Sequence, residues 1–217
     1  MIFFTADHHF DHQNVIRYCR RPFTGVNEMN EELVRRWNSV VTPNDTVYHL
    51  GDFSMAKRPV EFFGKQLNGE KHLIVGNHDR CHPRKKNSAE VQVLYINAGF
   101  SSFNVELKMR IASQEVLLNH FPYFAEESST TYKLKHQELS PKDKGLWLLH
   151  GHVHEKWKVK GRMINVGVDA WDFYPIPIST IESIISDHGI QPVDSKKFLE
   201  KAEEALKTHQ HAMDKLK

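Results

Sequence analysis

Short clusters of aspartate, asparagine and histidine recur along the chain, and side chains of these types bind divalent cations. The clusters are Asp7-His8-His9, Gly51-Asp52, Gly76-Asn77-His78-Asp79, Asn119-His120 and Gly151-His152-Val153-His154. Carboxylate and amide oxygens together with imidazole nitrogens suit Mn, Fe, Co or Zn rather than a metal that prefers thiolates. Two such cations about 3.5–4 Å apart, joined by a bridging carboxylate, bind both oxygens of an in-line displacement at phosphorus. The clusters therefore predict a site for divalent cations.

The spacing inside the clusters also favours a common site. In the D-x-H and H-x-H patterns, both outer side chains point the same way when the residues stand at the mouth of a strand. The glycines at positions 51, 76 and 151 permit a positive φ and a close approach of the backbone to a ligand. Both features indicate that several clusters face one ligand.

Each cluster follows an apolar run that predicts a buried β-strand. These runs cover residues 2–5, 46–50, 72–75, 115–119 and 146–149. In open α/β sheets, ligand sites lie just beyond the carboxyl ends of the strands. The strand ends alone therefore predict that the clusters form one shared site.

The remaining segments predict helices and a second sheet around these strands. Apolar spacing predicts a helix over 28–40, a further helix is expected over 58–67, and 103–111 alternates like an antiparallel strand. Residues 178–185 fit either a helix or a strand, and 194–217 have the spacing of a helix that packs on the body. We predict an α/β layer from the first half, with an antiparallel sheet from the second half packed on it.

Read in order, the clusters spell D-x-H, G-D, G-N-H-D, H and G-H-x-H. This series resembles the calcineurin-like metallophosphoesterase superfamily over residues 7–154. The resemblance implies one α/β domain over residues 1–217, in which two packed mixed β-sheets are flanked by helices as an αββα sandwich. It also implies a phosphatase or phosphodiesterase that uses two divalent cations, drawn from Mn, Fe, Ni, Co and Zn.

The resemblance further implies a role for each matching residue. One cation would be held by Asp7, His9, Asp52 and His154, and the other by Asp52, Asn77, His120 and His152. Asp52 would bridge the two cations, and a water molecule shared between them would be the nucleophile. His78 would stabilise the phosphoryl oxygens or protonate the leaving alkoxide. Asp79 would accept a hydrogen bond from the His78 ring and fix its tautomer.

The chain departs from the family pattern after its second cluster. The family often extends Gly51-Asp52 by an Asp or Arg three positions further on, where this chain has Met55. Arg58 and Arg80 are candidates to replace that contact with the substrate. Four further residues near the clusters fit either contact with the substrate or a hydrogen bond to the ring of a metal ligand: His8, Asp11, His12 and His150.

Composition and charge narrow the range of partners. Lys and Arg total 29 against 27 acidic residues, a formal charge of +2, which is no polyelectrolyte signature for wrapping duplex nucleic acid. The basic residues within 80–86 fit either a solvated loop or a rim that attracts phosphorylated substrates. Cys19 and Cys81 are expected to be reduced thiols in a cytoplasmic protein. We expect neither a signal segment nor a membrane span, because every apolar run is too short.

Three functions are compatible with these features. The favoured function is hydrolysis of a phosphomonoester or phosphodiester bond in a small or nucleotide substrate. A nuclease acting on DNA or RNA is an alternative, although no second domain is evident that would grip a polymer. A non-catalytic scaffold of the same fold is the other, although the ligand set and His78 are all present. Four aromatic residues fit either packing in the core or stacking on a nucleobase: Tyr123, Trp171, Phe173 and Tyr174.

Overall fold

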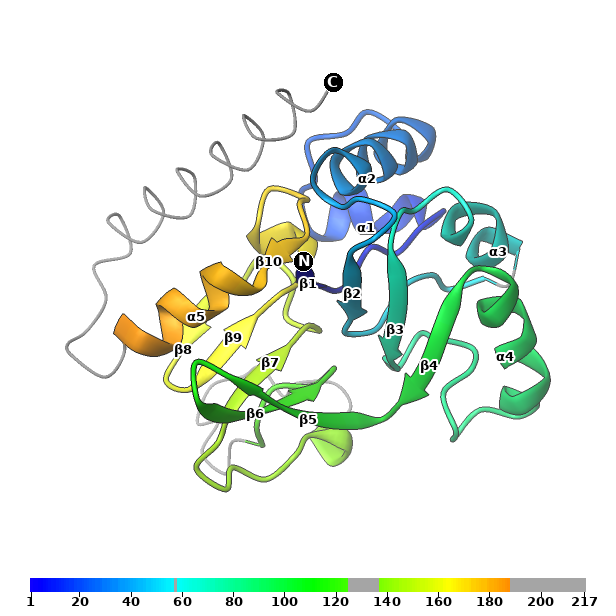
Figure 1. Cartoon of the computed structure of the whole chain (residues 1–217). Helices are drawn as coiled ribbons and strands as arrows, with labels where there is room; N and C mark the ends of the chain where they lie inside the picture. The colour runs from blue at the N-terminus through cyan, green and yellow to red at the C-terminus, as the bar shows by residue number, and fades with distance from the viewer. Residues whose placement is uncertain (57, 125–136, 188–217) are drawn as a thin grey trace.

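Two five-stranded mixed β-sheets form the centre of the molecule, and helices flank them (Figure 1). The computed structural model describes residues 1–56, 58–124 and 137–187. Helices α1 (Gln13–Tyr18), α2 (Val26–Val40), α3 (Arg58–Gly64) and α4 (Ser88–Asn97) lie on the side of the first sheet (Figure 1). Helix α5 (Ile178–Asp187) packs against strands of both sheets. The predicted fold class, α/β with two packed mixed sheets flanked by helices, is confirmed.

The first sheet has the strand order β10-β1-β2-β3-β4. Its strands are β1 (Ile2–Thr5), β2 (Thr46–His49), β3 (Glu70–Ile74), β4 (Phe100–Asn104) and β10 (Ile176–Pro177). Strands β1 to β4 run parallel, whereas β10 pairs antiparallel with β1. Because parallel neighbours end at the same edge of a sheet, the loops after β1, β2 and β3 leave it side by side.

The second sheet has the order β5-β6-β7-β9-β8. Its strands are β5 (Glu106–Ile111), β6 (Gln114–Asn119), β7 (Trp147–His150), β8 (Val159–Lys160) and β9 (Met163–Asn165). Only the pairs β5–β6 and β8–β9 are antiparallel, since β7 runs parallel to both β6 and β9. The expected antiparallel sheet is therefore mixed. Every residue of β7 is buried, as is usual for strands with parallel neighbours.

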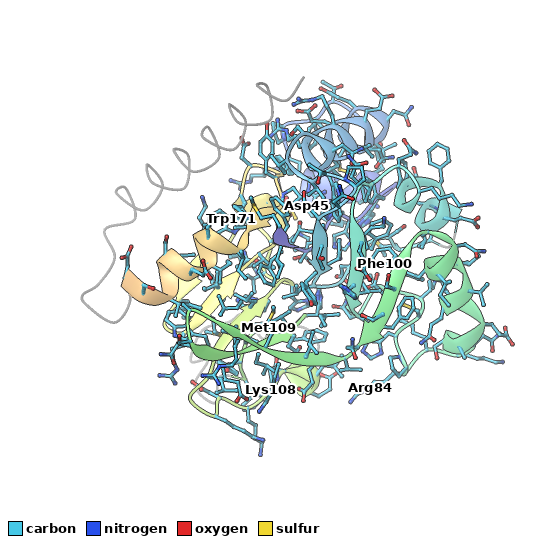
Figure 2. The ribbon with its side chains drawn as sticks, in the orientation of Figure 1. Asp45, Arg84, Phe100, Lys108, Met109 and Trp171 are labelled. Atoms are coloured by element: carbon cyan, nitrogen blue, oxygen red, sulfur yellow. The ribbon has the colours of Figure 1, made fainter. Side chains whose placement is uncertain are left out.

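Residues 103–111 do not form the single strand that their alternation predicts. Strand β4 belongs to the first sheet and β5 to the second, so the chain crosses between sheets at Val105, whose side chain is exposed. Along β5, Lys108 is exposed, whereas its neighbour Met109 is partly buried against the core between the sheets (Figure 2). Apolar and polar residues alternate in the sequence without a break through the crossing at Val105. The sequence pattern therefore does not indicate the change of sheet.

The helices agree with the predictions in part. They are α1 (Gln13–Tyr18), α2 (Val26–Val40), α3 (Arg58–Gly64), α4 (Ser88–Asn97) and α5 (Ile178–Asp187), with short 3-10 turns at Gln137–Leu139 and Val168–Ala170. The predictions over 28–40 and 58–67 correspond to α2 and α3, and the ambiguous segment 178–185 lies in α5. The helix predicted over 194–217 falls outside the described residues. Among the described helices, none combines the length and the apolar character needed to cross a bilayer.

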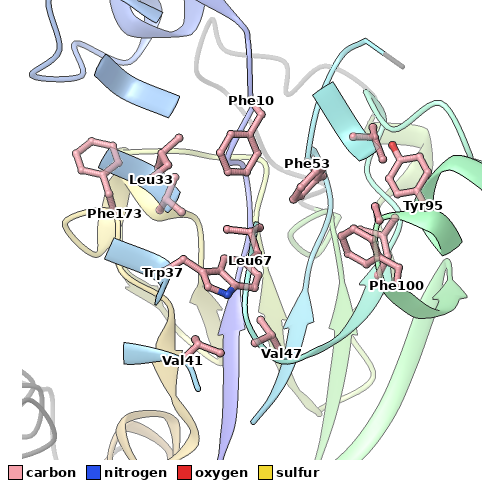
Figure 3. Packing of buried hydrophobic residues seen from close by; sticks show 14 of the residues in the cluster. Phe10, Leu33, Trp37, Val41, Val47, Phe53, Leu67, Tyr95, Phe100 and Phe173 are labelled. Atoms are coloured by element: carbon pink, nitrogen blue, oxygen red, sulfur yellow. The ribbon is translucent and has the colours of Figure 1, made fainter. Parts of the chain in front are cut away.

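The two larger hydrophobic cores hold the sheets in place. In the first core, Leu33 and Trp37 of α2 pack with Val47 of β2 and Phe53, and all four are buried (Figure 3). The second core lies between the sheets and contains Phe4, Leu50, Ile74, Val116, Leu118, Leu149 and Ile164. These cores fix the carboxyl ends of β1, β2 and β3 relative to those of β6 and β7.

Candidate metal centre

Hydrogen bonds join the loops that follow the strands of both sheets. The backbone N–H of Asp7 donates to Gly51 O at 2.9 Å, and that of His9 donates to Asp52 O at 3.0 Å. These bonds run the loops after β1 and β2 side by side. The backbone N–H of His152 donates to Asp7 Oδ2 at 2.9 Å, which ties the loop after β7 to the first sheet. The clusters therefore converge from both sheets, as their strand ends predict.

Two groups of possible cation ligands adjoin each other in this region. The first donor group is Asp7, His9 and His154, and the second donor group is Asp52, His120 and His152. Within each group, one ligand atom from every member lies within 4.8 Å of the others. Asp52 Oδ2 lies 3.6 Å from His9 Nε2 and 3.4 Å from His120 Nε2, and so stands between the groups.

Asn77 completes the predicted ligand set beside the second donor group. Its Oδ1 lies 3.2 Å from His120 Nε2. The structure thus brings together all seven side chains that the resemblance implies as ligands. Their binding of metal stays a prediction.

The backbone of these residues is unusual. Asp7, His9, Asp52, His152 and His154 have φ angles of 59°, 52°, 57°, 71° and 51°. Residues other than glycine adopt this left-handed region rarely, at a cost of roughly 1–3 kcal/mol each. Such strained residues cluster at functional sites, where the surrounding structure holds them in place.

Glycines make room for the central carboxylates. A Cβ at Gly151 would come within 2.5 Å of Asp7 Oδ2, and a Cβ at Gly76 would overlap Asp52 Oδ1. Both glycines belong to the clusters identified in the sequence. Their lack of a side chain lets the loops after β3 and β7 pass directly against the carboxylates of the two donor groups.

Hydrogen bonds also decide which ring nitrogen of His120 and of His154 faces the site. His120 Nδ1 donates to Leu50 O at 2.7 Å, because a carbonyl oxygen can only accept. Its Nε2 is thereby left for the second donor group. His154 Nδ1 lies 2.8 Å from Asp169 Oδ2, which leaves Nε2 for the first donor group. Orientation of a ligand ring through its other nitrogen is the usual arrangement at protein metal sites.

Two buried atoms of the first donor group are suited to a cation. Asp7 is fully buried and His9 is 2% exposed. Within the described part of the chain, Asp7 Oδ1 and His9 Nε2 have no hydrogen-bond partner. Buried polar atoms are nearly always paired, so such an atom needs an explanation, of which a bound ion is one. The residues present therefore fit a divalent cation.

The protonation of the metal-free protein reflects burial and mutual charge. Burial raises the pKa of Asp7 to about 6. Burial would lower the pKa of His120, but the nearby charge of Asp52 raises it to about 9. Burial would likewise lower the pKa of His154, and the hydrogen bond to Asp169 raises it to about 11. Near pH 7 without metal, both imidazoles are therefore protonated on both ring nitrogens and carry a positive charge.

We expect cation binding at pH 7 to release about two protons per chain, because an imidazole must be neutral to bind a metal. The protons come from His120 and His154, whose pKa values lie above 7. The apparent affinity should consequently rise as the pH increases from 7 toward 9. Calorimetric titration with Mn²⁺ in two buffers of different ionisation enthalpy gives the number of protons. A binding heat that is independent of the buffer would contradict the expectation.

Asp79 accepts hydrogen bonds from groups that the sequence does not predict as its partners. It is fully buried, and burial raises its pKa to about 6. At 2.8–3.2 Å, its oxygens accept hydrogen bonds from the backbone N–H groups of Asp52, Phe53 and Gly76 and from the hydroxyl of Tyr95. These bonds tie together the loops that carry Asp52 and Asn77, and the bond from the His78 ring to Asp79 stays a prediction.

The residues considered for substrate contact are placed differently from one another. Arg80 is exposed, and its Nε donates to Met55 O at 3.3 Å. The ring of His12 lies 5.5 Å from that of His9, at the border of the first donor group. Arg58 begins α3, and its side chain is outside the described part of the structure. Arg80 and His12 remain predictions as substrate contacts.

Other residues near the clusters belong to the interior. His8 and His150 are fully buried, so neither is open to a substrate. Tyr123, Trp171 and Phe173 are each less than one tenth exposed, which favours core packing over stacking on a nucleobase.

The sequence contains no indication of two charged residues behind the first donor group. Arg21 and Asp169 form a buried ion pair, with Arg21 Nε 2.7 Å from Asp169 Oδ1. They are separated by 148 positions, and neither belongs to a cluster. Asp169 stands between apolar residues, but a single charged residue in such a segment is too common to identify a site.

The fold and the site define a two-sheet α/β protein with aspartate and histidine clusters that could hold metal ions. No family model matches the sequence. The Gene 66 protein of Mycobacterium phage D29 is 32% identical over 202 residues, covering 86% of this chain and 96% of the phage protein. The uncharacterised protein MJ1445 of Methanocaldococcus jannaschii is 30% identical over 194 residues, covering 85% and 90%. The chain belongs to the family of these proteins.

A solved structure shares the fold. The protein of unknown function AQ665 from Aquifex aeolicus matches with a TM-score of 0.61 and 27% identity, covering 85% of this chain and 98% of its own. An archaeal phosphodiesterase matches with a TM-score of 0.41 and 16% identity, covering 76% and 81%. The second likeness is too distant to bear on activity.

Proposed function

We propose that the chain is a metal-dependent phosphoesterase that binds two divalent cations and hydrolyses a phosphomonoester or phosphodiester in a small or nucleotide substrate. The observation that carries the proposal is the position of Asp52 between two donor groups, each of one carboxylate and two imidazoles. When bound, two cations would polarise phosphate oxygens and lower the pKa of a water molecule. Mn, Fe, Ni, Co and Zn all suit this donor set.

In this proposal, the chain's own residues divide the remaining work. Asp52 supplies a negative charge to both cation positions. His78 donates a proton to the leaving oxygen, a role that suits a side chain both close to the donor groups and partly exposed. Its ring lies 5.4 Å from that of His9, and its backbone N–H donates to Asp52 Oδ1 at 2.8 Å. That bond couples the position of the acid to the central carboxylate.

Features around the site support an anionic substrate. Arg80 follows His78 and Asp79 directly and is exposed, and a guanidinium can bind a phosphate through paired N–H groups. His12 adds a second polar side chain beside the first donor group. Both residues would bind the substrate phosphate or its leaving group.

The test is a metal-reconstitution assay on the full chain. Protein stripped with a chelator is reloaded separately with Mn²⁺, Fe²⁺, Ni²⁺ and Zn²⁺, and the bound metal is counted by mass spectrometry. We expect two cations per chain and hydrolysis of p-nitrophenyl phosphate, bis-p-nitrophenyl phosphate or a member of a nucleotide panel. If no cation supports cleavage of any substrate, the proposal is rejected, and bound cations without cleavage would indicate a scaffold. Cleavage of a single-stranded oligonucleotide alone, falling steeply with salt, would indicate a nuclease instead.

A further inference from the structure

A buried ion pair stands behind the first donor group. Arg21 Nε donates to Asp169 Oδ1 at 2.7 Å, and Arg21 Nη2 donates to Asp169 Oδ2 at 2.9 Å. The side chains are 0% and 2% exposed. A two-bond contact between guanidinium and carboxylate fixes the orientation of both groups as well as their distance. Burying two charges is costly, and removal of one partner leaves the other charge buried and uncompensated. The pair therefore holds its surroundings in place only while both partners are present.

The arginine end of this pair holds the loop after β1. Arg21 Nη2 donates to Asp7 O at 2.7 Å, and Nη1 donates to His8 O at 2.8 Å. Asp7 and His9, the residues around these carbonyls, both have a positive φ. The guanidinium thus holds the backbone in the uncommon conformation that presents both side chains to the first donor group.

The aspartate end of the pair holds the third member of the group. Asp169 Oδ2 lies 2.8 Å from His154 Nδ1. An ionised carboxylate can only accept, so His154 Nδ1 carries the hydrogen and Nε2 is left for a cation. The rings of His154 and His9 stack with centroids 5.1 Å apart, so the fixed ring also sets the distance between two ligands.

We propose that Arg21 and Asp169 are positioning residues for one of the two cations, the one held by Asp7, His9 and His154. The proposal rests on the function proposed above. The ion pair reaches every member of the first donor group, through the carbonyls of Asp7 and His8 and the ring of His154. The second donor group is oriented by a different atom, the carbonyl oxygen of Leu50 behind His120. The two cation positions therefore depend on separate supports.

A competing arrangement uses the same region. Cys19, His154 and Asp169 also place one ligand atom each within 4.8 Å of one another and could hold a cation themselves. Against this, both oxygens of Asp169 already accept hydrogen bonds from Arg21, and Oδ2 also pairs with His154. Asp169 therefore acts on His154 through Nδ1 rather than as a ligand.

The experiment is a calorimetric Mn²⁺ titration of the full chain and its variants, with electron paramagnetic resonance to distinguish coupled from isolated Mn²⁺. In Asp169→Asn, we expect one cation to bind about 10–100-fold more weakly and the other to be unchanged, as is typical when the support of a metal ligand is lost. The spectrum should accordingly change from a coupled pair to an isolated ion at low Mn²⁺. Arg21→Lys, which keeps the charge but loses the two-bond contact, should weaken the same cation.

Three further variants make the result decisive. Asp172→Asn is the matched control, because Asp172 lies close by in the chain but is 81% exposed, and it should bind as the wild type does. Asp169→Glu keeps the charge and serves if Asp169→Asn fails to fold, with the same selective weakening expected. Cys19→Ser should leave both affinities unchanged, and a loss of one cation in this variant would favour the competing arrangement and overturn the proposal.

The outcomes separate this inference from the proposed function. If the wild type takes up no cation, the proposed function fails and this inference fails with it. If the wild type binds two cations and Asp169→Asn or Asp169→Glu binds both with wild-type affinity, only the inference is overturned. Equal weakening of both cations would also overturn it, since that result indicates a general structural role.

Discussion

Asp52→Asn is expected to weaken the binding of both cations and to lower phosphoesterase turnover by more than about 100-fold. This loss exceeds the 10–100-fold effect that is typical of residues that only support a metal ligand. Asp52 Oδ2 lies between His9 Nε2 and His120 Nε2 and is 2% exposed. Burial would raise the pKa of Asp52, but the neighbouring His120 and His9 lower it well below its usual value. The residue is thus the central negative charge of both donor groups. Asparagine removes that charge with almost no change in shape.

The measurement pairs Mn²⁺ titration with steady-state kinetics. The amide oxygen of the substituted side chain can still accept the backbone N–H of His78, since Asp52 uses Oδ1 for that bond, and we therefore expect the fold to persist. Asp143→Asn is the control. Its carboxylate forms an exposed ion pair with Arg162 at 3.0 Å, and such pairs contribute little to stability. Normal affinity for one cation in Asp52→Asn would show that the carboxylate serves a single position rather than bridging two.

The site could be predicted further than the fold because its signal is local. Each cluster follows a short apolar run, so each predicted strand and its predicted ligands are neighbours in the sequence. The structure brings the predicted ligands from Asp7 to His154 to one place because parallel strands end at a common edge within each sheet, and a hydrogen bond joins the loops beyond the two edges. The glycines at 76 and 151 were also informative, since a side chain at either position would meet a central carboxylate.

What could not be predicted depends on contacts between distant parts of the chain. The direction of β7 relative to β6 and β9 is set by the connections between strands. The alternation of apolar and polar residues is the same for parallel and antiparallel neighbours and therefore does not predict it. The crossing between sheets at Val105 interrupts neither the polarity pattern nor the strand-like composition. Arg21 and Asp169 lie far apart in sequence, and each alone looks like an ordinary charged residue. Asp79 was recognised, but its role in joining two loops follows only from four hydrogen bonds made in the folded chain.

His78→Ala is expected to leave both cations bound while lowering turnover by about 10²–10⁴, the range for loss of a general acid. The change keeps the backbone N–H that donates to Asp52 Oδ1, and therefore the local geometry of the central carboxylate. It removes only the partly exposed ring beside His9. Mn²⁺ titration should give wild-type affinities, in contrast to Asp52→Asn. Equal loss of metal in the two variants would mean that His78 is a ligand.

The leaving group provides a sharper criterion for the acid role. A nitrophenolate departs without a proton, whereas the alkoxide of an alkyl phosphoester requires one, so the loss in His78→Ala should be larger for the alkyl ester. The matched control is His72→Ala. His72 lies on the same β3–loop segment, but its ring pairs with Ser102 Oγ at 2.8 Å and stacks on Tyr48, away from both donor groups. This variant should keep wild-type turnover on both esters. An equal loss on the two esters in His78→Ala would assign His78 to stabilising phosphoryl oxygens instead of donating the proton, because that contribution does not depend on how well the leaving group departs.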